Sequence, residues 1–324
     1  MSVLIPTFNR AQALPRALQS VFCQDFTDFE VVVVDDGSTD ETSLVLDRLA
    51  DRRLRRFGFE KNRGIGAARR EGVARAQGRL IAFLDSDDCW KPGKLARVVA
   101  FLDANPTVEL VFSDFENVDE LRSTAERGFA EARPLLDRLA VRALPENWWL
   151  VEAGAAEALL HGNFVGTTSV VAAPRTLFDR IGNFRDDLSG PEDFECWWRA
   201  AVRGARFAYC GDVLVERHRD RSSITRSKRP FARQRLRALD ACDSAASEAG
   251  RLDLLAGLRQ ARARTYGDLI EACALEGRRA EAWRAFWAAR RLGWRAGSLK
   301  YLGLALLGPR LASMSRRALG RRAR

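Results

Sequence analysis

Residues 30–40 read EVVVVDDGSTD, and this stretch holds the two features on which the fold prediction depends. Its first half is apolar without alternation, as expected of a strand in a parallel sheet that helices cover on both faces. Its second half is polar and begins where that strand ends. Ligands of such sheets bind at this end of the strands, so the loop that follows is a candidate site.

Further strands are expected before and after this one, with helical stretches between them: Ser2–Pro6, Leu54–Phe59, Leu80–Asp85 and Val108–Ser113. Together with Glu30–Asp35 they predict a layered α/β domain. Two more of these strands end in polar residues, PTFNR at 6–10 and DSDD at 85–88. Residues 115–165 are less regular, and we interpret them as an insertion on the side where an acceptor molecule would bind.

The aspartates at 85–88 follow a buried strand, where carboxylates repel one another unless a cation neutralises them. A divalent metal that bridges a diphosphate fits, because Mg²⁺ or Mn²⁺ takes one or two carboxylates together with phosphate oxygens. The chain has two histidines and six scattered cysteines without CxxC spacing, which excludes a multi-histidine zinc site. The alternative is that these aspartates cap the helix that begins near Pro92.

The loop at 35–40 also has two interpretations. Ser38 or Asp40 can cap the following helix, and Gly37 allows the backbone to turn tightly. Asp35 and Asp36 exceed what capping requires, so one of them can accept hydrogen bonds from a base or ribose.

Two nucleotide-binding classes are excluded. NRGIGAARREG at 62–72 lacks the third glycine of a dinucleotide fingerprint and follows the third strand, not the first. The chain has no GxxxxGK[ST] motif, so P-loop chemistry is excluded as well. PTFNR is not the Gly-rich, basic loop that a nucleotidyltransferase would need after its first strand.

Five motifs, in their order and spacing, resemble the family 2 glycosyltransferases: 2–10, 35–40, 62–72, 85–88 and 192–199. The resemblance covers roughly residues 1–225, predicted as the catalytic domain. It implies a GT-A fold, in which helices flank a mostly parallel central sheet. It also implies a nucleotide-diphosphate sugar donor, for which we expect a UDP-sugar, and inversion at the anomeric carbon by a single displacement.

The resemblance implies roles for individual residues. The residues that would contact the nucleotide-sugar are Pro6, Thr7, Asn9, Asp35, Asp36, Asn62, Arg69, Asp85 and Ser86. Asp87, Asp88 and His218 would hold Mn²⁺ or Mg²⁺, and which aspartate is the main ligand stays open.

The acidic pair Glu192 and Asp193 matches the position of the catalytic base. Asp193 is our choice for the group that takes the proton of the acceptor hydroxyl. The alternative is an acidic first helical turn favoured by the helix dipole. Trp197 and Trp198 would face the acceptor, a saccharide or a lipid-linked molecule, and core packing is the alternative for both.

Charge is divided unevenly along the chain. Residues 1–220 contain 29 basic and 35 acidic residues, whereas residues 221–324 contain 24 basic and 8 acidic ones. Residues 226–324 are rich in Ala, Leu and Arg and predict a basic α-helical extension with repeat-like spacing. The last part, 298–324, joins an apolar stretch to an arginine cluster, which suits an interfacial helix on an anionic membrane surface.

The amino terminus lacks a basic stretch before a long apolar core, and no run of about 18 apolar residues occurs. We therefore expect a cytoplasmic enzyme, which the basic tail would hold at the inner face of the membrane. The family resemblance implies a role in surface polysaccharide or glycolipid assembly. The alternative is a non-catalytic GT-A-like protein that binds nucleotide, membrane or nucleic acid through its basic tail. No zinc, RNP or helix-turn-helix signature is present, so nucleic acid is not an expected partner.

Overall fold

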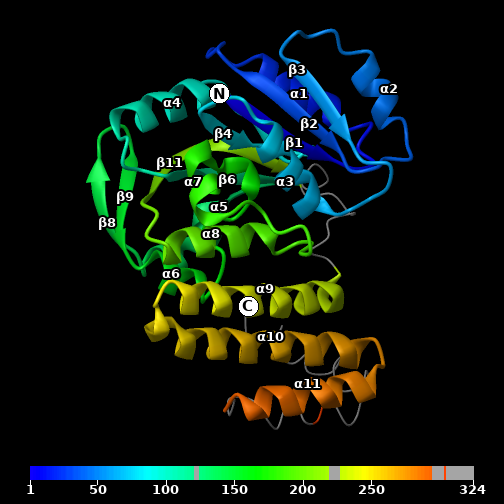
Figure 1. Ribbon diagram of the computed structural model, residues 1–324, viewed down its shortest axis with the longest axis vertical. Helices are drawn as coiled ribbons and strands as arrows, with labels where there is room; N and C mark the ends of the chain where they lie inside the picture. Colours follow the sequence, from blue (N-terminus) through cyan, green and yellow to red (C-terminus); the bar gives the residue numbers. More distant parts are fainter. Residues whose placement is uncertain (120–123, 219–226, 294–302, 304–324) are drawn as a thin grey trace. The chain divides into compact units, whose positions relative to one another are not determined.

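The computed structural model describes residues 1–119, 124–218, 227–293 and 303. Contacts within the chain divide it into two compact units, Met1–Ser223 and Ile224–Arg324 (Figure 1). The predicted domain boundary after residue 225 falls outside the described residues, and so does nearly all of the predicted membrane-binding segment 298–324.

The first unit is built on one sheet, whose strands follow the order β3-β2-β1-β4-β10-β6-β11-β9-β8. Their bounds are β1 Ser2–Thr7, β2 Glu30–Asp35, β3 Leu54–Gly58, β4 Leu80–Phe83, β6 Leu110–Asp119, β8 Ala140–Leu144, β9 Trp148–Ala153, β10 Ala172–Pro174 and β11 Phe207–His218. Two short strands extend it: β5 (Cys89–Trp90) pairs with β11, and β7 (Thr124–Arg127) pairs with β6.

The sheet is mixed. Strands β3, β2, β1 and β4 run parallel, as do β6 and β11, and the remaining pairings among the described strands are antiparallel. The five predicted strands are confirmed, with β4 two residues shorter and β6 longer than expected. Val31, Val32, Val33 and Val34 of β2 are fully buried, which explains why the apolar run does not alternate.

Helices flank this sheet in Figure 1. They are α1 Leu14–Phe22, α2 Thr42–Asp47, α3 Ile65–Arg75, α4 Lys94–Ala104, α5 Gly128–Leu136, α6 Ala155–Leu159, α7 Arg175–Ile181 and α8 Glu192–Val202. Helix α1 shows how the sequence selects a buried face: Leu14, Ala17, Leu18 and Val21 follow the helical period and are buried. Helix α3 packs on β1 and β2. The arrangement is a layered α/β domain, as the sequence predicts.

The expectation of an irregular stretch at 115–165 is wrong in its secondary structure. Strand β6 continues to Asp119 because it pairs in parallel with β11, and β8 and β9 form a hairpin at the edge of the sheet. Trp148 of β9 is buried and stacks on Phe101 of α4, with ring centroids 3.8 Å apart. These pairings join residues far apart in sequence, so local composition did not reveal them.

The described part of the second unit contains α9 (Lys228–Glu248), α10 (Leu255–Leu275) and α11 (Arg279–Arg291), which confirms the predicted helical extension. Its core joins small and apolar side chains from all three helices: Ala232, Leu269, Ile270, Cys273, Ala274, Ala282, Ala285 and Phe286. None of the helices described in either unit is both long enough and apolar enough to cross a bilayer.

Candidate active site

The loops after β1, β2 and β4 lie at one edge of the sheet, because these strands are parallel and in register. Thr7 is opposite Asp35 at the ends of β1 and β2. Asn9 connects the first loop to the second. Its side-chain oxygen accepts a hydrogen bond from the backbone amide of Thr39 at 2.8 Å, and its backbone amide donates one to the Ser38 hydroxyl at 2.9 Å. The two polar loops therefore form one surface.

Asp36 has a structural role in this surface. It is 3% exposed, and its two carboxylate oxygens accept hydrogen bonds from the amides of Arg63 and Gly64 at 2.7 and 2.9 Å. A Cβ atom on Gly37 would lie 2.6 Å from the backbone of Lys61, so the β2 loop passes directly against the segment that contains Asn62. Burial raises the pKa of Asp36. Both of its oxygens are engaged by backbone, so a ribose would have to share them.

Arg69 joins the loop after β4 to α8. The side chain is buried on α3, with one guanidinium nitrogen 2.6 Å from Asp85 Oδ1 and another paired with Glu192 Oε1. The sequence predicted that Arg69 would approach a base or phosphate, but in this structure it forms ion pairs with these two carboxylates, which neutralise its charge. The ion pairs fix Asp85 relative to the start of α8.

The aspartates after β4 differ in what they contact. Asp88 is 2% exposed, and its oxygens accept hydrogen bonds from the Ser169 hydroxyl at 2.6 Å and the amide of His218 at 3.1 Å. Asp87 is 25% exposed, and its carboxylate lies 3.4 Å from Arg10 Nη2. Asp88 therefore joins the loop to the 3₁₀ turn at Thr168–Val170 and to the end of β11, whereas Asp87 faces outward.

This group of carboxylates has the chemistry of a hard-cation site. Burial and the charge of Asp85 raise the pKa of Asp87, and burial together with both neighbouring aspartates raises the pKa of Asp88 well above its usual value. A divalent cation would relieve this repulsion. Within the residues that the structure describes, however, no three acidic, histidine or cysteine side chains are gathered as a ready metal site.

The two acidic residues that open α8 are not equivalent. Glu192 is 1% exposed and accepts a hydrogen bond from the amide of Gly190, and burial raises its pKa to about 7 despite the opposing charge of Arg69. Asp193 is partly exposed, and burial raises its pKa too, again against Arg69. Its Oδ2 accepts a hydrogen bond from the Asn163 side chain at 3.2 Å. Asp193 is therefore the carboxylate of the pair that another molecule can reach.

Asn163 and Ser169 were not predicted as site residues. Ser169 accepts a hydrogen bond from the Asp85 amide at 3.0 Å and donates to Asp88, and Asn163 orients Asp193. Their only signal in the sequence is that they are polar residues within or beside the apolar stretch 164–173. That signal does not show which aspartates they contact.

Trp197 and Trp198 are fully buried. Trp197 packs edge-to-face against Phe83 and Phe184, and the Trp198 indole donates a hydrogen bond to the Ala156 carbonyl. An acceptor sugar cannot reach either ring in this structure, because core side chains cover both. This corrects the predicted acceptor contact in favour of core packing.

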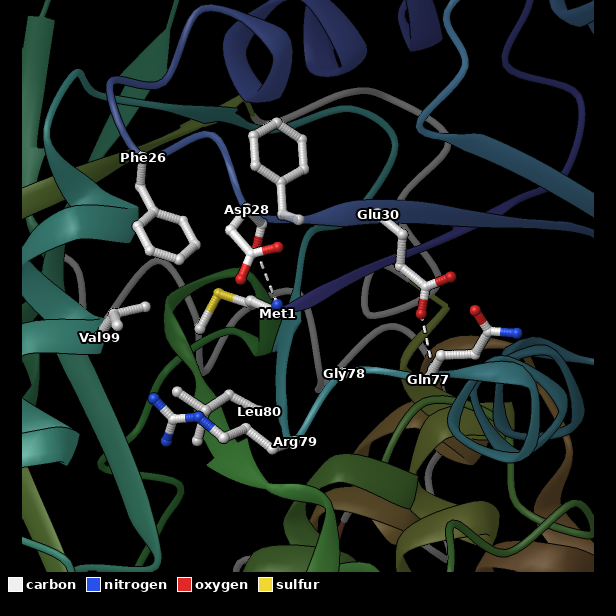
Figure 2. Close-up of a pocket in the computed structure, with 10 residues that line it drawn as sticks. Met1, Phe26, Asp28, Glu30, Gln77, Gly78, Arg79, Leu80 and Val99 are labelled. Atoms are coloured by element: carbon white, nitrogen blue, oxygen red, sulfur yellow. Dashed lines mark hydrogen bonds between the residues drawn. The ribbon is translucent and has the colours of Figure 1, made fainter.

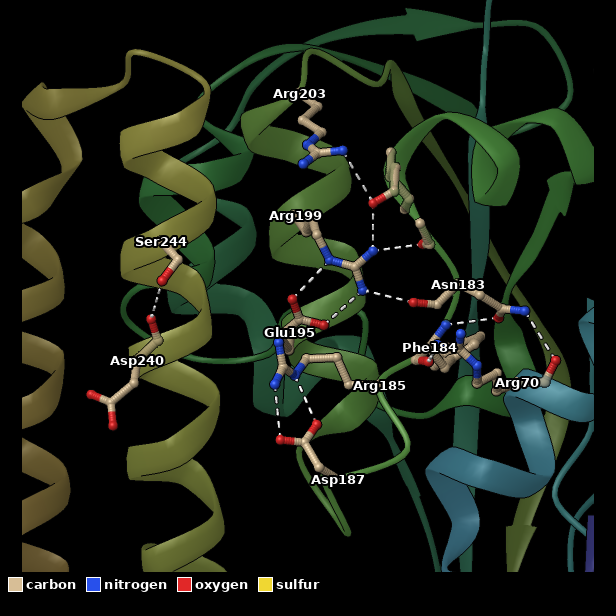
Figure 3. A network of polar contacts seen from close by, with 12 residues as sticks. Arg70, Asn183, Phe184, Arg185, Asp187, Glu195, Arg199, Arg203, Asp240 and Ser244 are labelled. Carbon is tan, nitrogen blue, oxygen red and sulfur yellow. Dashed lines mark hydrogen bonds and ion pairs between the residues drawn. The ribbon is translucent and has the colours of Figure 1, made fainter.

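Arg199, next along α8, is also structural (Figure 3). It forms two charged hydrogen bonds to Glu195 at 2.8 Å and donates to the carbonyls of Ile181, Gly182 and Asn183. The guanidinium thus fixes the end of α7 against α8.

A cavity of about 440 Å³ opens at the opposite edge of the sheet (Figure 2). Met1, Glu30 and Leu80, at the beginnings of β1, β2 and β4, lie along it. None of the predicted site residues lines this cavity, so it is separate from the loops at the strand ends.

Comparison with known proteins agrees with this geometry. The model of glycosyl transferase family 2 matches residues 2–154. An uncharacterized glycosyltransferase of Nostoc is 37% identical over 43% of the chain and 44% of its own length. The succinoglycan biosynthesis protein ExoO of Rhizobium meliloti is 37% identical over 45% of the chain and 40% of its own length. The chain spans less than half the length of these two relatives.

Solved structures support the fold. TarS 1–349 of S. aureus, in complex with UDP-GlcNAc, superposes with a TM-score of 0.59 at 18% identity, covering 98% of this chain and 91% of that one. The mannosyltransferase PcManGT of Pyrobaculum calidifontis, in complex with GDP-Man and Mn²⁺, gives 0.57 at 22% identity, covering 95% and 86%. Residues 2–154 therefore match glycosyl transferase family 2, and the similarity to these solved structures shows that the chain has a GT-A fold.

Proposed function

We propose that the protein transfers a sugar, with inversion, from a nucleotide-diphosphate sugar to a hydroxyl of a saccharide or lipid-linked acceptor. The observation that carries this proposal is the pair of contacts from Arg69 to Asp85 and Glu192. They hold the start of α8, with its reachable carboxylate Asp193, beside the loop predicted to bind the donor. The residues to which we assign donor binding and the role of base thus lie at one edge of one sheet.

In the proposed reaction, the acceptor oxygen attacks the anomeric carbon and its proton passes to the carboxylate of Asp193. The bond from that carbon to the diphosphate oxygen breaks, and the nucleoside diphosphate leaves with the electron pair. A raised pKa makes Asp193 a stronger base than an ordinary aspartate. Asn163, through its hydrogen bond, orients the carboxylate.

The donor would lie on the loops after β1, β2 and β4. Pro6, Thr7 and Asn9 would contact it from the first loop, Asp35, Asp36 and Asn62 from the second, and Asp85 and Ser86 from the third. A UDP-sugar is our preferred donor, because the structure of TarS similar to this chain contains UDP-GlcNAc.

A divalent cation belongs to the proposal as well. Asp87, whose side chain is partly exposed, and His218, at the end of β11, would hold Mn²⁺ or Mg²⁺, while Asp88 contacts Ser169 and the backbone of His218. The mannosyltransferase with a similar fold contains Mn²⁺. When bound, such a metal neutralises negative charge on the diphosphate of the leaving group.

The biological setting that we propose is surface polysaccharide or glycolipid assembly, since one relative is named for succinoglycan biosynthesis. A cytoplasmic location, peripheral on the inner membrane face, is part of the same proposal. It places the enzyme where nucleotide-sugars and lipid-linked acceptors meet.

The test measures thermal unfolding of the protein with UDP, GDP, CDP or dTDP, each with and without Mn²⁺. We expect one nucleotide to raise the melting temperature in a metal-dependent way, and Asp87→Ala to abolish that rise. Asp103→Ala removes an exposed aspartate of α4 and should leave the response intact. If no nucleotide shifts the wild-type protein, the transferase proposal fails in favour of a non-catalytic GT-A-like protein.

A further inference from the structure

Helix α11 separates its residues sharply between two faces. The face toward the helical core is made of small and aromatic side chains, Ala282, Ala285, Phe286 and Ala289. The exposed positions are Arg279, Ala280, Trp283, Arg284, Trp287, Arg290 and Arg291. The exposed face therefore combines positive charge with large aromatic surface and contains no acidic residue.

The single acidic residue of α11 points the other way. Glu281 is paired with Arg233 of α9 at 2.5 Å, and its side chain is 14% exposed. Arg229 of α9 lies 3.9 Å from the same carboxylate. The negative charge of the helix is thus neutralised by arginines of α9, and its own arginines are exposed.

The two exposed tryptophans are held in place by the core. Trp283 and Trp287 are 37% and 48% exposed, and their rings lie edge-to-face with centroids 5.7 Å apart. Trp283 also stacks on the buried Phe286 at 5.9 Å. Large exposed aromatic side chains lose favourable burial energy in water, and pre-ordered rings lose little conformational entropy when they bind.

We propose that this exposed face of α11 binds the surface of an anionic lipid bilayer. Tryptophan rings favour the boundary between water and acyl chains, and arginines beside them attract anionic headgroups. Thirteen residues of helix are about 20 Å long, which suits a helix lying in the interface and is too short to span the bilayer.

The charge of the following sequence supports the choice of partner. Residues 294–324 contain eight basic residues and no acidic one. The chain thus continues from α11 with the charge that an anionic membrane attracts. This inference concerns binding alone and does not depend on the proposed transfer reaction.

The experiment uses the full-length chain and flotation with vesicles, either phosphatidylcholine alone or phosphatidylcholine mixed with phosphatidylglycerol. Arg284→Gln with Arg291→Gln removes two positive charges from the face. We expect partition onto the anionic vesicles to fall about thirtyfold, or about fivefold for each arginine, at low ionic strength. Trp283→Ala with Trp287→Ala should also reduce partition, and the wild-type protein should not float with neutral vesicles.

The matched control is Arg237→Gln with Arg259→Gln, which removes the same charge from exposed positions of α9 and α10. It should bind like the wild type. All the substituted side chains are exposed, and thermal unfolding of each variant checks that the fold is retained. Equal binding of the α11 arginine variant and the wild type to anionic vesicles would overturn the proposal. The segment after α11 would then be sufficient for membrane binding.

Two further outcomes would also refute it. Wild-type protein that fails to float with anionic vesicles does not bind this surface. Protein that ignores vesicles but shifts DNA in a salt-sensitive gel assay, with the shift lost in the α11 variant, would make nucleic acid the partner of the face.

Discussion

The strand-end edge of the sheet and the three-helix unit use charged residues in opposite ways. At the edge, Arg69, Asp88 and Glu192 are at most 3% exposed, and each is held by charged or polar partners. In the described part of the helical unit, Thr265 is the one buried polar side chain, and the core is otherwise alanine, leucine, isoleucine, cysteine and phenylalanine. Ion pairs there, such as Arg233 with Glu281, lie at the surface.

The two regions therefore differ in the amino-acid substitutions that they can tolerate. A buried charge is costly without its partner, so the edge depends on specific residues far apart in sequence. A small apolar core leaves the surface of the helices free to change. We expect substitutions at the edge to have large effects and those on the helical surface to have small effects on stability, which leaves that surface available for binding.

The largest effect is expected for Asp193→Asn, which keeps the shape of the side chain but removes the proposed base. The turnover rate should fall by about 10²–10⁴-fold, while nucleotide binding in the thermal assay is retained. Asp186→Asn, at an exposed position before α8, is the control and should keep full activity. Unchanged turnover in Asp193→Asn would remove this residue from the reaction.

The same residue sets the expected pH profile. A protonated carboxyl cannot accept the acceptor's proton, so activity should fall as the pH drops through the raised pKa of Asp193. The acidic limb of the profile should therefore lie above the ordinary range of an aspartate. It should move in Asn163→Ala, which removes a hydrogen bond to the carboxylate.

The next effect is on stability, from Arg69→Met. This change leaves Asp85 and Glu192 without their cation, and we expect a loss of about 3–5 kcal/mol in urea unfolding. The pKa of Glu192, about 7, adds a pH dependence: at pH 5 the carboxyl is neutral and the loss should be smaller than at pH 8. A loss that is the same at both pH values would mean that Glu192 does not change its charge between pH 5 and pH 8, which would contradict a pKa of about 7.

A third prediction concerns Lys94, which is fully buried on α4 and donates a hydrogen bond to the Val170 carbonyl. Burial lowers its pKa to about 7, so the folded protein binds a proton there less readily than the unfolded chain. Its contribution to stability is complete above the unfolded pKa near 10.5 and is lost as the pH falls toward 7. Lys94→Met should remove this slope, which is at most about 1.4 kcal/mol per pH unit.

The control for this pH dependence of stability is Lys228→Met, at an exposed position of α9. It removes the same charge from the helical unit and should leave the pH dependence of urea unfolding unchanged. A slope that persists in Lys94→Met would assign the pH dependence to other groups.

The smallest effect is expected for Arg233→Met on α9. Its partner Glu281 has a second arginine nearby, and the Arg233 side chain is 53% exposed, so the loss should be below about 1 kcal/mol. If Arg233→Met lost as much unfolding free energy as Arg69→Met, the two regions would not differ in their dependence on charged residues.

The site was only partly predictable from the sequence, because the partners of its buried charged residues are far away along the chain. Asp85, Asp87 and Asp193 could be selected because carboxylates directly after a buried strand or at a helix start can serve only a small number of roles. Asp36 and Arg69 were predicted to contact the nucleotide-sugar, and their partners in this structure are protein groups. Arg69 and Glu192 are 123 residues apart, and no local pattern indicates that they meet.

The sequence alone determined the five predicted strands, the polar loops that follow three of them, the resemblance to the family 2 glycosyltransferases, and the charge division between the two parts of the chain. These follow from apolar runs, motif order and composition, which are local properties. The tertiary structure alone decided that Asp88 is held by Ser169, that Asp193 is the reachable carboxylate, that Trp197 and Trp198 are core, and that α11 presents tryptophan and arginine outward. Each of these depends on burial, and a side chain becomes buried only when segments distant in sequence pack against it.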